Sequence, residues 1–220
     1  MAPVLLSLQV ALLATLVSGT LAVGLAGTLT HVPWKARALL DALLTSPLVL
    51  PPSVLGYYLL VLVGRQTVVG AAWEAVTGGP LVFSKAGALV AACVTAFPFV
   101  LQAALGAMES VDPVLLDAAR TLGAGRIRTF TRVTLPLAAR GVAAGVVLGF
   151  ARSLGDFGAT LMVAGNVPGQ TQTAALFIYD EVLAGHAERA QPMVLTMTAV
   201  AVGSMVAARL LGARAQGGRR

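Results

Sequence analysis

Long apolar stretches alternate with short polar ones along the chain. Five of the apolar stretches approach the roughly 20 residues that a helix needs to cross a bilayer. They lie at residues 4–28, 39–63, 82–108, 141–163 and 190–211. Only helices and closed barrels satisfy all their backbone groups inside a bilayer, so this pattern predicts an all-α polytopic membrane protein. We expect about five transmembrane helices in a single domain that covers residues 1–220.

Proline interrupts the second of these stretches. The dipeptides Ser46-Pro47 and Pro51-Pro52 both fall inside it. Each proline removes a backbone donor and clashes with the preceding turn. A broken helix at membrane depth is tolerated beside protein or a wet cavity, so we expect this span to lie beside a pathway. Kinks without any function are also common.

Glycines recur at close intervals in the first and fourth stretches. They are Gly19, Gly24 and Gly27 in the first stretch, and Gly141, Gly145 and Gly149 in the fourth. Small residues let the backbones of two helices approach closely. We therefore expect these two spans to pack tightly against neighbouring helices, above all along the regular seam of the fourth.

The main polar interruption covers residues 109–136 and is called the polar segment below. Asp112 followed by Pro113 is typical of a helix start. The first N–H groups of a helix have no acceptor within the helix, so the carboxylate can accept from them, and a proline in the first turn sacrifices no hydrogen bond. Gly123 and Gly125 should end this helix. Three arginines follow, namely Arg126, Arg128 and Arg132. The pattern predicts a short basic amphipathic helix that docks a partner, although an ordinary cytoplasmic loop would have the same composition.

The polar segment resembles the EAA loop of ABC-importer permeases, in which Glu-Ala-Ala is followed by three residues, Gly, nine residues and Ile-x-Leu-Pro. The matching residues are Asp117-Ala118-Ala119, Gly123 and Val133-Thr134-Leu135-Pro136. Asp for Glu and Val for Ile keep charge or shape. The resemblance implies that residues 109–136 are a cytoplasmic coupling loop whose helix sits in a cleft of an ATPase subunit. The residues that it implies for this contact are Asp117, Ala118, Ala119, Arg120, Gly123, Leu135 and Pro136.

Composition supports a membrane protein and disfavours several other functions. Of the 220 residues, 57% are hydrophobic and 11% are charged, whereas soluble domains carry about 25% charged residues. Positive charge is concentrated in loops, which makes nucleic-acid binding a poor interpretation. Cys93 is the single cysteine, and His31 and His186 are too far apart to suggest a metal site or a catalytic triad. No Walker A pattern occurs, so we expect no catalysis and no cofactor on this chain, with ATP and Mg²⁺ bound by a partner ATPase.

The distribution of basic residues predicts the orientation of the five spans. On one side lie Lys35, Arg37, Arg120, Arg126, Arg128, Arg132, Arg140, Arg209, Arg214, Arg219 and Arg220. On the other side lie Arg65, Lys85 and Arg189. Cytoplasmic loops carry the excess of Lys and Arg, so the N-terminus should face outward and the C-terminus and polar segment should face the cytoplasm.

Two charged residues fall inside the fourth stretch. Arg152 and Asp156 are four residues apart and should share one helix face. An unpaired charge at the bilayer centre costs about 2.5–3.5 kcal/mol, and an i,i+4 pair offsets much of that cost. The pair could lie beside a translocation pathway, where arginine lowers the barrier for an anion, or could be purely structural. The residues that we expect along a pathway are Pro51, Pro52, Arg152, Ser153, Asp156 and Thr160.

Four stretches resemble permease subunits of molybdate ABC importers. They are residues 47–52, 118–126, 151–160 and 166–169. The resemblance implies the MetI-like fold of type I importer permeases and a bacterial inner-membrane homodimer. It also implies two docked ATPase subunits and a soluble molybdate-binding protein, with ATP-driven alternating access as the mechanism.

Three functions remain open from the sequence. The first is a molybdate permease, with tungstate as a related cargo. The second is a sulfate or thiosulfate permease of the same fold, although such subunits are usually longer and have an extra N-terminal span. The third is a channel or a membrane-embedded enzyme, which the polar segment and the missing catalytic residues disfavour.

Overall fold

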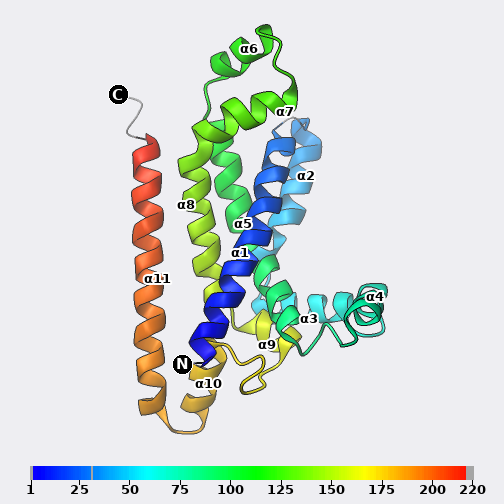
Figure 1. The fold of residues 1–220 in the computed structure, drawn as a ribbon, viewed down its shortest axis with the longest axis vertical. Coiled ribbons are helices and arrows are strands. Elements are labelled where there is room, and N and C mark those ends of the chain that lie inside the picture. The colour runs from blue at the N-terminus through cyan, green and yellow to red at the C-terminus, as the bar shows by residue number, and fades with distance from the viewer. Residues whose placement is uncertain (1, 31, 217–220) are drawn as a thin grey trace.

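The computed structural model describes residues 2–30 and 32–216, and every regular element in this part of the chain is helical (Figure 1). The α-helices are α1 (Ala2–Leu29), α2 (Trp34–Thr45), α3 (Pro52–Val63), α4 (Val68–Thr77), α5 (Lys85–Glu109), α6 (Pro113–Thr121), α7 (Arg126–Thr129), α8 (Leu135–Leu154), α9 (Gly158–Ala164), α10 (Ala174–Leu183) and α11 (Ala187–Gln216). A 3-10 turn, η1 (Ser46–Leu48), follows α2, and a π-helical stretch, η2 (Phe130–Thr134), joins α7 to α8. His31 lies outside the described residues, as do Arg219 and Arg220.

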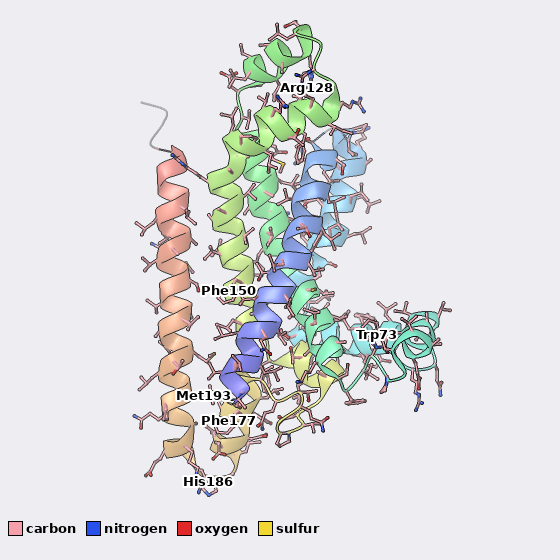
Figure 2. The ribbon with its side chains drawn as sticks, viewed as in Figure 1. Trp73, Arg128, Phe150, Phe177, His186 and Met193 are labelled. Atoms are coloured by element: carbon pink, nitrogen blue, oxygen red, sulfur yellow. The ribbon has the colours of Figure 1, made fainter. Side chains whose placement is uncertain are left out.

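Four helices in the described part of the chain are long and apolar enough to cross a membrane, and a bent pair makes a fifth candidate. The four cover Ala2–Leu29, Lys85–Glu109, Arg126–Leu154 and Ala187–Gly212. α1 begins near α10, whereas α11 ends near α6 and α7, so the chain enters and leaves at opposite ends of the bundle (Figure 1). Arg128 marks the polar-segment end, and Phe177 and His186 mark the α10 end (Figure 2). This arrangement agrees with about five crossings.

The core of the bundle consists of α1, α5 and α8, which pack closely through small residues. A Cβ added to Gly145 would lie 2.4 Å from the Cβ of Ala103, and one added to Gly141 would lie 2.6 Å from the Cβ of Ala107. The predicted seam on the fourth span is therefore confirmed as the contact between α8 and α5. In the first span, Gly27 lies against the ring of Phe130, while a Cβ added to Gly24 would meet no other part of the described chain within 4 Å.

The second predicted span, residues 39–63, is not one continuous helix. The helical runs Lys35–Leu48 and Pro52–Val63 meet at an angle of 108°. Pro47 ends regular α-helical hydrogen bonding, and Pro51 takes an extended conformation ahead of Pro52 at the start of α3. The break was predicted from these prolines, but the size of the bend was not.

The helices around the fourth predicted span, residues 141–163, have other bounds than that span. The helical run begins at Arg126 and passes through η2 into α8, so Pro136 stands in the first turn of α8 rather than opening a new span. α8 then stops at Leu154, and α9 starts only at Gly158. Glycine at position 155 and a buried carboxylate at Asp156 favour a helix end and a new cap, which an apolar count over residues 141–163 does not register.

The helices α10, α11 and α4 lie around the core. α11 (Ala187–Gln216) extends beyond the expected 190–211 at both ends and contains Pro192. α10 (Ala174–Leu183) lies outside the five predicted spans, and Ala174 N–H donates to Ser7 Oγ of α1 at 2.8 Å. α11 packs on α8 and α10 and remains largely exposed. α4 carries Trp73 and projects sideways from the bundle (Figure 2).

Candidate functional site

The helix of the polar segment starts and stops as its sequence predicts. Asp112 Oδ1 accepts the Val114 N–H at 2.9 Å, and Pro113 follows in the first turn of α6. Gly123 has φ +79°, the left-handed conformation that glycine adopts without strain, so it ends the helix. Gly125 does not contribute to that end, because it has an extended conformation and precedes α7 as its N-cap.

α6 presents apolar side chains to the surroundings instead of the core. None of its residues is buried, and Val114 is 70% exposed. Leu122 and Ile127 beside it are 87% and 81% exposed. Leu116, by contrast, packs partly against the core. Large apolar groups that stand out among arginines fit a protein partner better than the bilayer or the core of this chain.

The acidic and basic residues of the polar segment lie on the same exposed surface. Arg120 Nη1 donates to Asp117 Oδ1 at 3.0 Å, and both side chains are more than half exposed. Ala118 is exposed and Ala119 half-buried beside them. An exposed pair of this kind contributes only about 0–1 kcal/mol to stability, so its atoms remain available to a partner.

The polar segment is joined rigidly to the bundle. Thr129 is buried, the ring of Phe130 contacts Gly27 of α1, and η2 continues into α8 through Leu135 and Pro136. No flexible linker separates α7 from α8. α7 therefore continues through η2 into α8 and contacts α1 through Phe130, without an irregular segment between α7 and α8.

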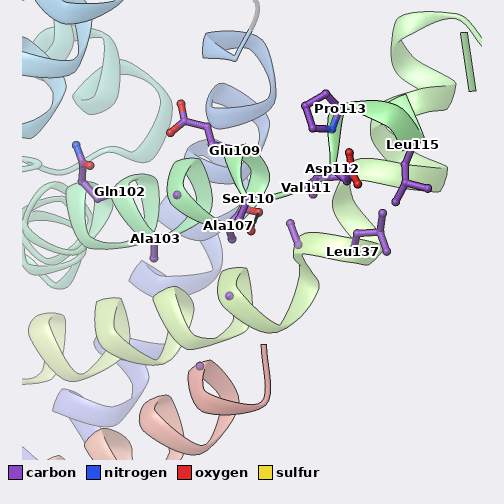
Figure 3. Close-up of a pocket in the computed structure, with 14 residues that line it drawn as sticks. Gln102, Ala103, Ala107, Glu109, Ser110, Val111, Asp112, Pro113, Leu115 and Leu137 are labelled. Carbon is purple, nitrogen blue, oxygen red and sulfur yellow. Dashed lines mark hydrogen bonds between the residues drawn. The ribbon is translucent and has the colours of Figure 1, made fainter. Parts of the chain in front are cut away.

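A cavity of about 950 Å³ opens at the base of the polar segment (Figure 3). Its lining comes from the last turns of α5, residues 110–115, the first turns of α8 and Gly212 of α11. The polar side chains that line it include Gln102, Glu109 and Asp112. The sequence analysis missed Gln102 and Glu109, although a glutamine at position 102 within an apolar stretch was a signal that could have identified one of them.

The two interrupted spans meet near the α10 end of the bundle. A Cβ added to Gly158 at the start of α9 would lie 2.8 Å from the Cβ of Pro52 at the start of α3. Gly56 approaches α9 equally closely, at Met162. The breaks between α2 and α3 and between α8 and α9 thus form one contact, called the broken-helix junction below. It brings Pro51 and Pro52 to the same place as the charged pair of the fourth span.

Asp156 is almost fully buried at this junction and has three hydrogen-bonding contacts. Thr160 donates to Asp156 Oδ2 through its backbone N–H at 2.9 Å and its hydroxyl at 2.7 Å. Arg152 Nη1 donates to Asp156 Oδ1 at 3.4 Å, and the Arg152 side chain is 28% exposed. The expectation that Arg152 and Asp156 share one helix face is wrong, because α8 ends between them. The ion pair forms across that break.

Ser153 has a packing role in the same region. Its hydroxyl donates to Phe150 O at 3.0 Å and lies 3.5 Å from Ala11 O of α1, and the side chain is buried. The structure therefore gathers all six predicted pathway residues near one end of the bundle. It places the predicted contact residues of the polar segment at the opposite end (Figure 1).

Polar side chains that the sequence analysis did not single out fasten the loop between α9 and α10. Asp180 Oδ2 accepts from Asn166 Nδ2 at 2.7 Å and from Gln172 Nε2 at 2.9 Å. On the other side of the bundle, Arg65 and Glu74 form an exposed ion pair that joins the end of α3 to α4. The Arg65 guanidinium lowers the pKa of the Glu74 carboxyl by hydrogen bonding to it.

Residues 5–217 match the model of the family described as binding-protein-dependent transport system inner membrane component. The molybdenum transport system permease protein ModB of Escherichia coli K12 is 47% identical over 176 residues, covering 80% of this chain and 77% of that protein. ModB of Haemophilus influenzae is 44% identical over 174 residues, covering 79% and 76%. The sulfate transport system permease protein CysT of Escherichia coli K12 is 36% identical over 169 residues, covering 77% and 61%.

Two solved structures have a similar fold. A chain of a bacterial alginate ABC transporter, in complex with an alginate pentasaccharide-bound periplasmic protein, has a TM-score of 0.72 at 17% identity, covering 97% of this chain and 78% of that one. A chain of the MetNI methionine ABC transporter in an inward-facing conformation has a TM-score of 0.64 at 16% identity, covering 95% and 96%.

Proposed function

The chain belongs to the family of binding-protein-dependent transport system inner membrane components, and we propose from this premise that it is the membrane-spanning permease subunit of a molybdate ABC importer. Its fold is that of type I ABC-importer permeases. The observation that carries the choice of cargo is the similarity to molybdenum permeases at 44–47% identity over about three quarters of their length.

The sulfate permeases are a weaker match. They are 34–36% identical, and the aligned part of this chain covers only 60–61% of their length. This difference favours molybdate, with tungstate as a related tetrahedral dianion, over sulfate or thiosulfate. A channel is disfavoured because the family works with binding proteins, as its description states.

The polar segment is the surface that docks the ATPase in this proposal. Its exposed Val114, Leu122 and Ile127 supply apolar contacts, and Asp117 and Arg120 supply polar ones. ATP and Mg²⁺ would bind to that partner, and this subunit would contribute no catalytic group. Because η2 joins the segment to α8 without a flexible linker, closure of the ATPase dimer would move the spans directly.

A second copy of this chain would complete the permease, with the pathway between the two copies. In this proposal Pro51, Pro52, Arg152, Ser153, Asp156 and Thr160 at the broken-helix junction lie along that pathway. Broken helices at a junction are suited to such a role, because irregular backbone at membrane depth is stable only beside protein or a wet cavity. A soluble molybdate-binding protein would deliver the anion at the α10 end.

Deletion of the gene tests the cargo. We expect molybdoenzyme activity to fall about tenfold at trace molybdate and to recover at high external molybdate through slower, less selective uptake. Growth on sulfate as the sulfur source should not change. A deletion strain that fails on sulfate and keeps its molybdoenzymes would assign the chain to sulfate instead. The restored strain, carrying the gene on a plasmid, is the control.

Thiol labelling tests the proposed orientation, with the N-terminus outside and the C-terminus in the cytoplasm. In a Cys93→Ala background, Gly185→Cys places a thiol in the exposed turn between α10 and α11. An impermeant maleimide should label this variant in intact cells. It should label Gly217→Cys only after the membrane is opened. The reverse pattern would invert the topology.

A further inference from the structure

Two side-chain pairs tie α2 to α5 near the base of the polar segment. Arg37 forms an ion pair with Glu109, and Gln102 Nε2 donates to Asp41 Oδ1 at 2.7 Å. Arg37 and Asp41 are four residues apart on α2, while Gln102 and Glu109 are seven apart on α5, so each set lies on one helix face. Figure 3 shows Gln102 and Glu109 on the side of α5 away from Ala103 and Ala107, which face α8. The two pairs are therefore in antiparallel register.

Within a single copy of the chain, the rest of α2 is little buried. None of its described side chains is buried, and Leu39 and Leu43 are 65% and 62% exposed. Leu44 packs partly against the core near the end of the helix. By contrast, α1, α5 and α8 meet along closely packed small residues. The two polar pairs are therefore a large part of what attaches α2 to the bundle. The attachment of α1, α5 and α8 comes mainly from close packing.

The position of the two pairs connects the two regions described above. Glu109 is the last residue of α5, and Asp112, the N-cap of α6, follows three residues later. At its other end α2 runs through η1 into the break before Pro52, where α3 meets α9. α2 therefore reaches from the base of the polar segment to the broken-helix junction.

We propose that Glu109 and Gln102 are positioning residues that hold α2 to the base of the polar segment, so that a movement imposed on that segment is transmitted along α2 to the broken-helix junction. This inference rests on the proposed function, because it takes the polar segment as the surface on which the ATPase acts. Neither residue needs to touch the transported anion.

The contacts between α2 and α5 are weak enough to allow α2 to move. The Arg37 and Glu109 side chains are 28% and 45% exposed, and exposed ion pairs contribute about 0–1 kcal/mol each. Their loss should leave the closely packed core folded. It should instead let α2 lag behind the polar segment, so that ATP is hydrolysed without a matching movement at the junction.

The test measures uptake per ATP hydrolysed in proteoliposomes that contain the permease, its ATPase and the loaded binding protein. We expect Glu109→Gln and Arg37→Gln each to lower this ratio three- to tenfold, with ATPase activity largely retained. The charge-swapped variant Arg37→Glu/Glu109→Arg should recover at least half of the ratio. Glu74→Gln, which removes the similar exposed pair with Arg65 near the α10 end, is the matched control and should leave the ratio unchanged.

A second measurement follows the movement itself and does not depend on the cargo. Val49 lies in the break after η1 and is 87% exposed. In a Cys93→Ala background, the labelling rate of Val49→Cys should change when ATP is added to the assembled transporter, and Glu109→Gln should abolish that change. An unaltered coupling ratio and an unaltered labelling response in Glu109→Gln would overturn the inference. If the wild-type chain does not assemble with an ATPase at all, the proposed function fails, and this inference fails with it.

Discussion

Gly123→Asp is expected to abolish transport, at least fiftyfold, while the permease still folds and reaches the membrane. Gly123 has φ +79°, and no atom lies within 4 Å of an added Cβ. Aspartate is one of the few residues with a side chain that visits this conformation, so the cost to the fold should be about 1 kcal/mol or less. The new carboxylate would, however, stand on the surface that we assign to ATPase docking. Burying an unpaired charge against a partner costs several kcal/mol.

The matched control for this substitution is Gly185→Asp. Gly185 has φ +78° and equally open surroundings, but it lies at the α10 end of the bundle. Both variants carry the same strain and the same added charge, so any difference between them reflects location. Co-purification with the ATPase compares the two variants, and uptake in reconstituted transporters is measured for Gly123→Asp, because Gly185 lies at the end that we assign to the binding protein. Normal transport by Gly123→Asp would remove the basis for treating the polar segment as the coupling surface.

The helix ends of the polar segment could be predicted from sequence because their determinants are local. Asp112, Pro113 and Gly123 each fix the conformation of their own backbone through a cap, a ring or a left-handed turn. The seam of glycines on α8 is similarly local, since spacing alone puts its members on one face. Elements of this kind depend on few distant contacts.

The extent of the interrupted spans could not be predicted from the same information. An apolar count over residues 141–163 registers neither the end of α8 at Leu154 nor the new cap that Asp156 provides through Thr160. The helical runs before and after the break meet at 108°, and the start of α3 at Pro52 packs on Gly158, which is more than a hundred residues away in the chain. The ties of Gln102 and Glu109 to α2 are also long-range, so a sequence read in order does not show them.

The ion pair at the junction can be separated from its surroundings by a double-mutant cycle. Arg152→Ala would leave Asp156, whose side chain is 1% exposed, with Thr160 as its remaining partner. Removing one partner of a buried pair is costly, because the remaining charge is no longer compensated. We expect about 2 kcal/mol of destabilisation, roughly a thirtyfold change in the folded-to-unfolded ratio. The Arg152–Asp156 contact is long, at 3.4 Å, so its loss should be moderate. Thr160 still donates to the Asp156 carboxylate after the substitution, which should keep the destabilisation near this value.

The unpaired charge that Asp156→Ala leaves behind should destabilise the fold less than the one that Arg152→Ala leaves behind. The Arg152 side chain is 28% exposed, so its guanidinium remains partly solvated. Asp156→Ala would also remove the acceptor of both Thr160 donors, and Thr160→Val isolates that hydroxyl contribution with a side chain of the same shape. If the pair interacts, Arg152→Ala/Asp156→Ala should be more stable than the sum of the two single losses predicts, by about 1 kcal/mol or more. The measurement is the midpoint of thermal unfolding for each purified permease in detergent. Additive losses would show that the two side chains act independently, and the charge of Arg152 would then have to be explained by the pathway alone.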